Sequence, residues 1–460
     1  MRKSQNRFIM DMDRIQSNEY ASVCRTAENT FVRNRKMPLQ DLLLTMINRK
    51  GLTLTLELRN YMKTAHPGTE ISKPGYLKQR MKLNPDAFLD LYRYHNKNFY
   101  NEPGYATYNG YLILAADGSN LNVPTNKETL ETFGTSSRKN TKPQASIGLG
   151  CLYDVMNRMI IESDCNRCKF DEMAVAESQI DRVYETIGTE QPFLVVMDRG
   201  YPSTPAFIRM MDKNIYFLVR LKNSDYKNEQ ASLECNDNWI DIVLDKSRIR
   251  HYEGTAMAER MRELGHIYLR MVKICLDDGN YEVLLTNLPT EKFSTEQLAD
   301  LYHMRWSIET AYETLKSRLQ IENFTGTKPQ LLLQDIYSTI YVSNLSEDII
   351  LEMQQELNEK DKKYKHKMAI NQTISIGILK NDLIYIILEK DKEKQEALFN
   401  KLYDDISKNL VPVRPDRHYK RTQGQLAGKY SNSHKRAFYE SLYEGWGIYA
   451  HFRSRNSKEF

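Results

Sequence analysis

The sequence lacks the long apolar runs that mark membrane proteins. No stretch of its 460 residues approaches the roughly 18 consecutive apolar residues of a membrane span, and its basic start is not followed by the apolar core of a signal peptide. Mean hydropathy is −0.62, and 27% of the residues are charged. These values predict a cytoplasmic protein that has no membrane partner and buries a large core.

Cysteine is also scarce, since six residues in 460 cannot provide a disulfide framework. Cys165 and Cys168 form one CxxC pair, but no second pair of cysteines or histidines stands nearby at zinc-finger spacing. We therefore expect reduced thiols, with a zinc site as the alternative.

Positive charge is concentrated at the two ends of the chain. Residues 1–100 hold 18 Lys and Arg against 9 Asp and Glu, and residues 411–460 hold 10 against 4. Because the whole chain carries only +5, the remaining middle carries −10. Basic flanks around an acidic centre are typical of a protein that grips a polyanion and collects divalent cations, although solvated surface charge produces the same bias.

Two aspartates follow continuous apolar runs in this acidic middle. The run 111–116 leads into Asp117, and the run 193–197 leads into Asp198. Runs of this length, bounded by turn residues, predict buried strands of an α/β sheet. A carboxylate at the end of such a strand is either a turn residue or a ligand.

Residues 294–320 are predicted to form one helix. Ser294 is a suitable N-cap, and Gln297 completes a capping box. At about 100° per residue, four polar side chains fall on one stripe of that helix. They are Tyr302, Arg305, Glu309 and Lys316. Taken alone, this stripe could equally be an ordinary solvent-exposed face of a helix.

The order of the acidic residues and the spacing of the helix motif together resemble a known family. The motifs are Tyr302-x2-Arg305-x3-Glu309-x6-Lys316 and Asp198-Arg199-Gly200-Tyr201. They are similar to those of the transposases of bacterial insertion-sequence family 4, which are of DDE type. The similarity spans positions 117–316 and implies a ribonuclease-H-like core, with Asp117, Asp198 and Glu309 as the catalytic acidic residues.

The resemblance implies metal-dependent chemistry at these three carboxylates. Asp117 and Asp198 would be shared ligands of two Mg²⁺ or Mn²⁺ ions, and Glu309 would bind one of them. Cleavage of a phosphodiester would free a 3′-OH at the end of the element. That hydroxyl would then attack the target strand.

The other motif residues are expected to contact DNA. Arg305 and Lys316 would hold phosphates, and Tyr302 would hydrogen-bond a phosphate of the cleaved end. Trp306 would pack against an end nucleotide, with core packing as its alternative. The resemblance also implies the partners: double-stranded DNA, as element ends and as target, and a second copy of the chain in a paired-end complex. A nucleoid-associated location follows from these partners.

Strand and helix patterns predict an α/β protein. The resemblance implies a ribonuclease-H-like mixed sheet core with a β-rich insertion. The patterns outside it predict a helical N-terminal domain and a helical C-terminal region with a basic tail. The predicted boundaries are 1–105 for the N-terminal DNA-binding domain, 106–221 and 294–328 for two parts of the catalytic core, 222–293 for the insertion and 329–460 for the C-terminal region.

The predicted insertion contains a hairpin signal and three notable aromatic residues. Residues 277–280 have the composition of a hairpin turn. Trp239, Tyr268 and Tyr281 are candidates for stacking on bases, although burial in the core is the favoured interpretation.

Two other functions share these sequence features. A metal-dependent nuclease with the same core but no strand transfer would carry the same carboxylates, and an inactive DNA-binding remnant would keep the basic flanks. The spacing of the helix motif and the basic flanks argue against the nuclease. The presence of all three acidic residues argues against the remnant.

Overall fold

The structure is a computed structural model that describes all residues except 33–35, 138–141, 234–235, 276–278, 360–363 and 415–460. The basic C-terminal tail and the first half of the predicted turn at 277–280 therefore lie outside the described residues. The chain forms two compact units. We call Arg93–Thr314 the sheet unit, and Met1–Tyr92 with Leu315–Phe460 the helical unit.

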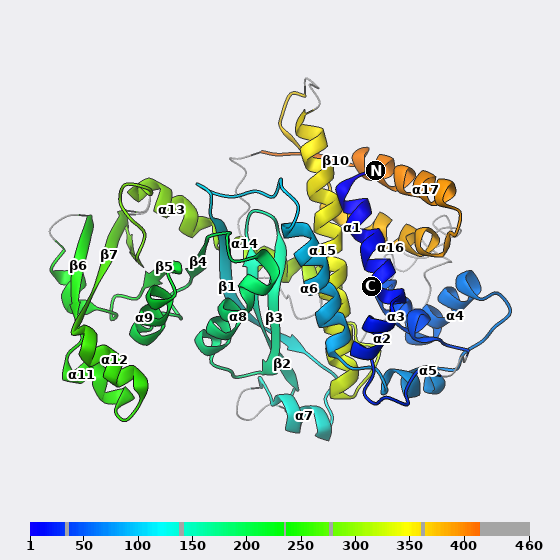
Figure 1. The fold of residues 1–460 in the computed structure, drawn as a ribbon, viewed down its shortest axis with the longest axis horizontal. Coiled ribbons are helices and arrows are strands. Elements are labelled where there is room, and N and C mark those ends of the chain that lie inside the picture. Colours follow the sequence, from blue (N-terminus) through cyan, green and yellow to red (C-terminus); the bar gives the residue numbers. More distant parts are fainter. Residues whose placement is uncertain (33–35, 138–141, 234–235, 276–278, 360–363, 415–460) are drawn as a thin grey trace, which may run out of the picture. The chain divides into compact units, whose positions relative to one another are not determined.

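The sheet unit is built on one eight-stranded mixed sheet with the order β3-β2-β1-β4-β5-β8-β7-β6 (Figure 1). Strand β4 pairs in parallel with β1 and β5, and the other neighbouring strands are antiparallel. The strands are β1 (Leu112–Asn122), β2 (Ser146–Asp154), β3 (Met159–Arg167), β4 (Phe193–Met197), β5 (Tyr216–Leu221), β6 (Asp237–Val243), β7 (His266–Cys275) and β8 (Tyr281–Thr286).

This topology confirms the predicted fold class. Strand β4 lies between two parallel neighbours and all five of its residues are buried, which explains its continuous apolar run. The strands of the predicted insertion, β6 to β8, continue the same sheet through the pairing of β5 with β8. The five-part division of the chain stays a prediction.

Helices cover the sheet and close its connections. Helix α8 packs on β1, β2 and β3, α13 packs on β5 and β7, and α14 packs on β1. The helices of this unit are α7 (Lys127–Phe133), α8 (Glu172–Ile187), α9 (Thr204–Asp212), α10 (Lys227–Ala231), α11 (Lys246–Ile249), α12 (Ala256–Leu264), α13 (Thr295–Met304) and α14 (Ser307–Glu313).

The helical unit is organised around one long helix, α15 (Pro329–Glu359), which packs against α1, α3, α16 and α17. None of the described helices combines the length and apolarity that crossing a bilayer would need. The other helices are α1 (Lys3–Gln16), α2 (Asn18–Val23), α3 (Leu39–Ile47), α4 (Leu54–Ala65), α5 (Lys73–Arg80), α16 (Gln372–Leu388) and α17 (Lys392–Ser407), and α6 (Asp86–Tyr100) includes the boundary between the units.

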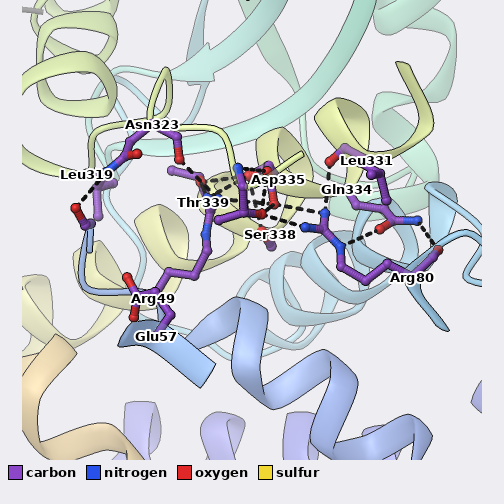
Figure 2. Close-up of polar contacts among 12 residues, drawn as sticks. Arg49, Glu57, Arg80, Leu319, Asn323, Leu331, Gln334, Asp335, Ser338 and Thr339 are labelled. Carbon is purple, nitrogen blue, oxygen red and sulfur yellow. Dashed lines mark hydrogen bonds and ion pairs between the residues drawn. The ribbon is translucent and has the colours of Figure 1, made fainter. Parts of the chain in front are cut away.

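A buried ion cluster joins three segments of the helical unit. Figure 2 shows Arg49 and Arg80 approaching the Asp335 carboxylate from opposite sides, with Nη-to-Oδ1 distances of 3.1 and 2.9 Å. The Thr325 backbone N–H donates to Asp335 Oδ2 at 2.7 Å, and Arg80 Nε donates to Gln334 Oε1 at 3.0 Å. Every charge in this cluster therefore has a partner of opposite charge, as buried charges require.

Candidate active site

The register of the sheet brings Asp117 level with Asp198. Strand β1 pairs in parallel with β4 as far as Ala115 opposite Val196, and Asp117 and Asp198 each stand two residues further on. Neighbouring strands lie about 4.8 Å apart, and residues in register point to the same face. The two carboxylates are therefore close in space although they are distant in sequence.

The prediction that Asp117 ends its strand is wrong. Strand β1 continues to Asn122, and Asp117 pairs with Cys151 of β2. The apolar run stops at residue 116 because the buried parallel pairing with β4 stops there. The antiparallel pairing with β2 continues and does not require apolar side chains on both faces.

The environment of Asp117 disfavours a negative charge. Burial raises its pKa to about 6, and the charges of Asp198 and Glu172 add to the rise. The Gly118 N–H and the Arg305 guanidinium oppose it. A half-buried carboxyl group with like charges nearby is a frequent feature of functional sites.

Asp198 lies in a tight turn that explains the residues following it. The Gly200 N–H donates to Asp198 Oδ1 at 2.6 Å, and a Cβ atom on Gly200 would meet that oxygen at 2.9 Å. A larger residue at this position would therefore have to displace the Asp198 carboxylate. Tyr201 is 2% exposed, and its hydroxyl donates to the Glu172 carboxylate.

The motif segment begins as predicted but is not one continuous helix. The capping box of Ser294 and Gln297 is present. Helix α13 ends at Met304, α14 begins at Ser307, and Thr314–Arg318 forms a π-helix. Around Arg305 the backbone N–H groups bond to carbonyls three residues back. Each break shifts the directions in which the following side chains point around the helix axis. A sequence analysis that assumes a constant 100° per residue cannot detect such a shift.

Arg305 connects Glu309 electrostatically with the two aspartates. Its Nη2 donates to Glu309 Oε1 at 3.2 Å, and its charge also interacts with those of Asp117 and Asp198. Arg305 is 6% exposed, and its buried Nε has no hydrogen-bond partner among the described residues. Arg305 thus contacts one of the three predicted catalytic residues, Glu309, and interacts with the charges of the other two, Asp117 and Asp198.

The predicted DNA-contacting residues differ in exposure. Trp306 is 41% exposed, which contradicts core packing, whereas Tyr302 is buried under the Arg305 guanidinium, 5.9 Å from its ring centroid. Burial raises the pKa of Tyr302. Lys316 falls in the π-helix at the start of the helical unit. Burial lowers its pKa, and Glu322 opposes that effect.

Two residues at the site carried no signal in the sequence motifs. Glu172 opens α8 and lies beside Asp117 and Asp198. The Tyr312 hydroxyl donates to the Asp117 carbonyl oxygen at 2.8 Å, which fixes α14 against β1. Tyr312 lies one turn after Glu309, but nothing in the sequence indicates that its hydroxyl reaches another strand.

The described residues contain no group of three His, Cys, Asp or Glu side chains close enough to hold a metal ion together. The predicted donors are Asp117, Asp198 and Glu309, and the Glu309 carboxylate accepts a hydrogen bond from Arg305. Carboxylate oxygens are the ligands that hard divalent cations prefer.

The three aromatic residues of the β6–β8 region are exposed, so the expected burial in the core is wrong. Trp239, Tyr268 and Tyr281 have exposed fractions of 47%, 53% and 46%. Along β6 exposed residues alternate with buried ones from Trp239 onward, which shows that one face of this strand is open. Lys273 Nζ lies 4.1 Å from the Tyr281 ring centroid.

A protein-family model described as "Transposase DDE domain" matches residues 108–345, slightly more than half of the chain. The chain belongs to this family. The match begins just before β1 and includes every residue of the site. The family confirms the resemblance on which the motif prediction rested, and it implies a general dependence on divalent metal ions.

Individual relatives agree with the family. The chain is 37% identical over 146 residues to the transposase of insertion sequence IS421 from Escherichia coli, covering 31% of this chain and 38% of that one. It is 20% identical over 352 residues to the transposase InsG of IS4 from E. coli K12, covering 74% and 76%. It is 20% identical over 307 residues to the transposase of IS231C from Bacillus thuringiensis, covering 63% and 58%.

Among solved structures, the chain is similar to the piggyBac transposase in a synaptic complex with hairpin DNA. The sequences are 11% identical, the TM-score is 0.44, and the alignment covers 89% of this chain and 87% of the other.

Proposed function

We propose that this member of the DDE family is the transposase of an IS4-type insertion sequence. It binds the terminal inverted repeats of the element, cuts the DNA there and joins the freed end to target DNA. The observation that supports the proposal is the level placement of Asp117 and Asp198 on neighbouring strands, with Arg305 bonded to Glu309, interacting with the charges of both aspartates and holding a buried Nε without a partner among the described residues.

The three carboxylates suit two Mg²⁺ or Mn²⁺ ions. Asp117 and Asp198 stand level on neighbouring strands, and their like charges disfavour each other, which a bound cation reverses. Asp117 and Asp198 would be shared between the ions, and Glu309 would bind one. When bound, the ions supply charge stabilisation for the attacking and leaving oxygens of a displacement at phosphorus.

The protein side chains supply the positioning. The Arg305 Nε donates to a non-bridging oxygen of the scissile phosphate, a group that prefers a guanidinium partner. Tyr302 holds a phosphate of the cleaved end, and the exposed Trp306 ring packs against an end nucleotide. Lys316 holds a DNA phosphate. Water attacks the phosphodiester and frees a 3′-OH, which then attacks a phosphodiester of the target strand.

DNA is the proposed partner in both steps, as element end and as target. Because two ends must be cut and joined together, the proposed active form is a homodimer that holds the paired ends.

The test uses the purified chain, a labelled duplex that carries the DNA flanking its reading frame, and Mg²⁺ or Mn²⁺. Wild-type protein is expected to cut at the repeat boundary and to transfer the 3′-OH to a target plasmid. Glu309→Gln is expected to bind the duplex without cutting it. Asp300→Asn, an exposed carboxylate of α13, is the matched control and should cut normally.

Three results would contradict the proposal. Cutting by Glu309→Gln would show that the site is misassigned. Cutting by wild-type protein without transfer to the plasmid would indicate a nuclease. Binding without cutting by wild-type protein would indicate an inactive DNA-binding remnant.

A further inference from the structure

A small pocket lies beside the buried ion cluster of the helical unit. Its wall includes Arg49, Glu57 and Leu319, which Figure 2 labels, and Lys380 of α16. All of its lining residues belong to the helical unit, so one compact unit forms the whole pocket. The cavity volume is about 20 Å³. This is enough for one water molecule or one monatomic ion and too small for the phosphate group of DNA.

The Lys380 ammonium group is poorly satisfied in this pocket. An ammonium group carries three donors. Among the described residues, its one hydrogen bond goes to the Leu319 carbonyl oxygen at the long distance of 3.4 Å. Burial lowers the pKa of Lys380 to about 8, so the group is still mostly charged at pH 7. Two of its donors are therefore available to a ligand.

Glu57 stands near Lys380 but is bonded to the backbone. Its Oε1 accepts hydrogen bonds from the Lys50 and Leu52 N–H groups at 2.9 and 2.8 Å. Lys380 forms no ion pair with Glu57 or with any other described residue. The Arg49 charge lowers the pKa of Lys380 more than the Glu57 charge raises it. The electrostatic potential at the Lys380 ammonium is therefore positive.

The adjoining ion cluster adds to this positive potential. Asp335 is the one carboxylate that faces both Arg49 and Arg80 there. With Lys380 and Glu57 included, three positive groups stand against two negative ones, which leaves one positive charge in excess. Arg49 also lines the pocket, and its buried Nε has no hydrogen-bond partner among the described residues. Buried charge that the protein does not balance favours a counter-ion.

We propose that this pocket binds one monovalent halide ion, held by the Lys380 ammonium group beside Arg49. The bound ion supplies the missing negative charge, and its hydrogen bonds with the ammonium are charge-assisted. Because only the folded chain forms the pocket, the ion stabilises the helical unit. The inference is independent of the proposed function, since none of these residues belongs to the candidate active site. A water molecule, which brings no charge, is the alternative occupant.

The test follows thermal unfolding of the full chain at pH 7 while sodium gluconate is replaced by sodium chloride at constant ionic strength. Gluconate is too large for the pocket, so it serves as the reference anion. In gluconate, Lys380→Met should melt above wild type, because it removes a charge that lacks a partner. Chloride should raise the melting temperature of wild type relative to this variant by roughly 2 to 4 °C.

Two further variants separate halide binding from a general effect of salt. Glu57→Gln removes the opposing negative charge, and its amide oxygen can still accept from the backbone, so its chloride response should exceed that of wild type. Lys394→Met removes an exposed charge of α17 and is the matched control, with a wild-type response. A residue that only contributed packing would not give responses of opposite sign in Lys380→Met and Glu57→Gln.

A crystal soaked in bromide locates the ion directly. Anomalous scattering should show one bromide beside Lys380 Nζ in wild type and none there in Lys380→Met. Equal chloride responses in wild type and Lys380→Met, or a pocket without bromide in a wild-type crystal, would overturn the halide site and leave water as the occupant. None of these outcomes bears on DNA cleavage, so the proposed function stands or falls separately.

Discussion

The fold shifts the pKa values of two carboxylates, Asp335 and Asp117, in opposite directions. Burial alone would raise the pKa of Asp335, but Arg49 and Arg80 outweigh burial and hold that pKa below its usual range (Figure 2). At the sheet, burial raises the pKa of Asp117 to about 6, and Asp198 adds to the rise. The charge of Asp335 is compensated by two arginines inside the protein, whereas the proposed role of Asp117 leaves its charge to be compensated by a bound cation.

The difference teaches which acidic groups stabilise the fold and which serve chemistry. A fully paired buried charge becomes costly when its partner is removed. A charge held near like charges costs stability in the folded chain and is retained where function needs it. Substitutions in the two clusters should therefore have opposite signatures.

The largest effect is expected for Asp198→Asn. DNA cleavage should fall at least roughly thousandfold, about 4 kcal/mol of barrier, because a proposed shared cation ligand is lost. Urea unfolding of the metal-free protein should show no loss of stability, because the substitution removes a repelling charge. Equal cleavage by this variant, or clear destabilisation, would remove the contrast between the clusters.

Asp335→Asn should do the reverse. It leaves Arg49 and Arg80 without their counter-charge in a buried place, which costs about 3 to 5 kcal/mol in the free energy of unfolding of the helical unit. Urea unfolding measures the loss, and Asp404→Asn, an exposed residue of α17, is the control. A change below about 1 kcal/mol would mean that the cluster contributes little to stability.

Lys380 offers an intermediate case within the helical unit. It lines a pocket with Arg49 and Glu57, and its ammonium reaches the Leu319 carbonyl oxygen at the long distance of 3.4 Å. Burial lowers its pKa to about 8, with Arg49 adding to the fall and Glu57 opposing it. Its charge is thus less well compensated than that of Asp335.

Lys380→Met should therefore stabilise the protein at pH 7, by about 1 to 2 kcal/mol. Between pH 8 and about 10.5 the unfolded chain holds a proton that the folded chain has lost, so wild-type stability should rise with pH there. The variant should lack that rise. Urea unfolding at several pH values, with Lys394→Met of α17 as exposed control, checks both statements, and a parallel rise in the variant would contradict them.

The smallest effect is expected for Tyr312→Phe. It leaves the Asp117 and Leu149 carbonyl oxygens without the hydroxyl that donates to them at 2.8 and 3.2 Å. The expected cost is about 1 kcal/mol in the free energy of unfolding. Cleavage should fall several-fold as well, because α14 carries Glu309. Reduced stability with a wild-type cleavage rate would show that Tyr312 serves packing alone.

Much of the fold could be predicted from the sequence. The run 193–197 matches β4 residue for residue, and the capping box of Ser294 and Gln297 starts α13 as expected. These two predictions succeed because burial between parallel strands produces a continuous apolar run, and capping requires particular residues at fixed spacing. Both signals lie within a short stretch of sequence. The continuous helix over 294–320 failed because the turn near Arg305 keeps nearly helical dihedral angles, φ −51° and ψ −34°, and so leaves no mark on side-chain pattern.

The prediction that the aromatic residues of the insertion are buried was also wrong, for a different reason. Trp239 and Tyr268 stand in strands whose composition is typical of a core, and they are exposed because none of the described residues covers that face of the strands. Which face of a strand is covered depends on elements elsewhere in the chain, so composition cannot decide it.

The sequence by itself determined which side chains can hold cations and phosphates, because residue type and motif spacing are local and chemical. Only the tertiary structure decided that Asp117 stands level with Asp198, that Arg305 reaches Glu309 and both aspartates, and that Glu172 joins them. The parallel pairing of β1 with β4 and the packing of α8 and α14 on the sheet bring these residues together across long separations in the chain. Such proximity is a property of the folded chain, and no local pattern encodes it.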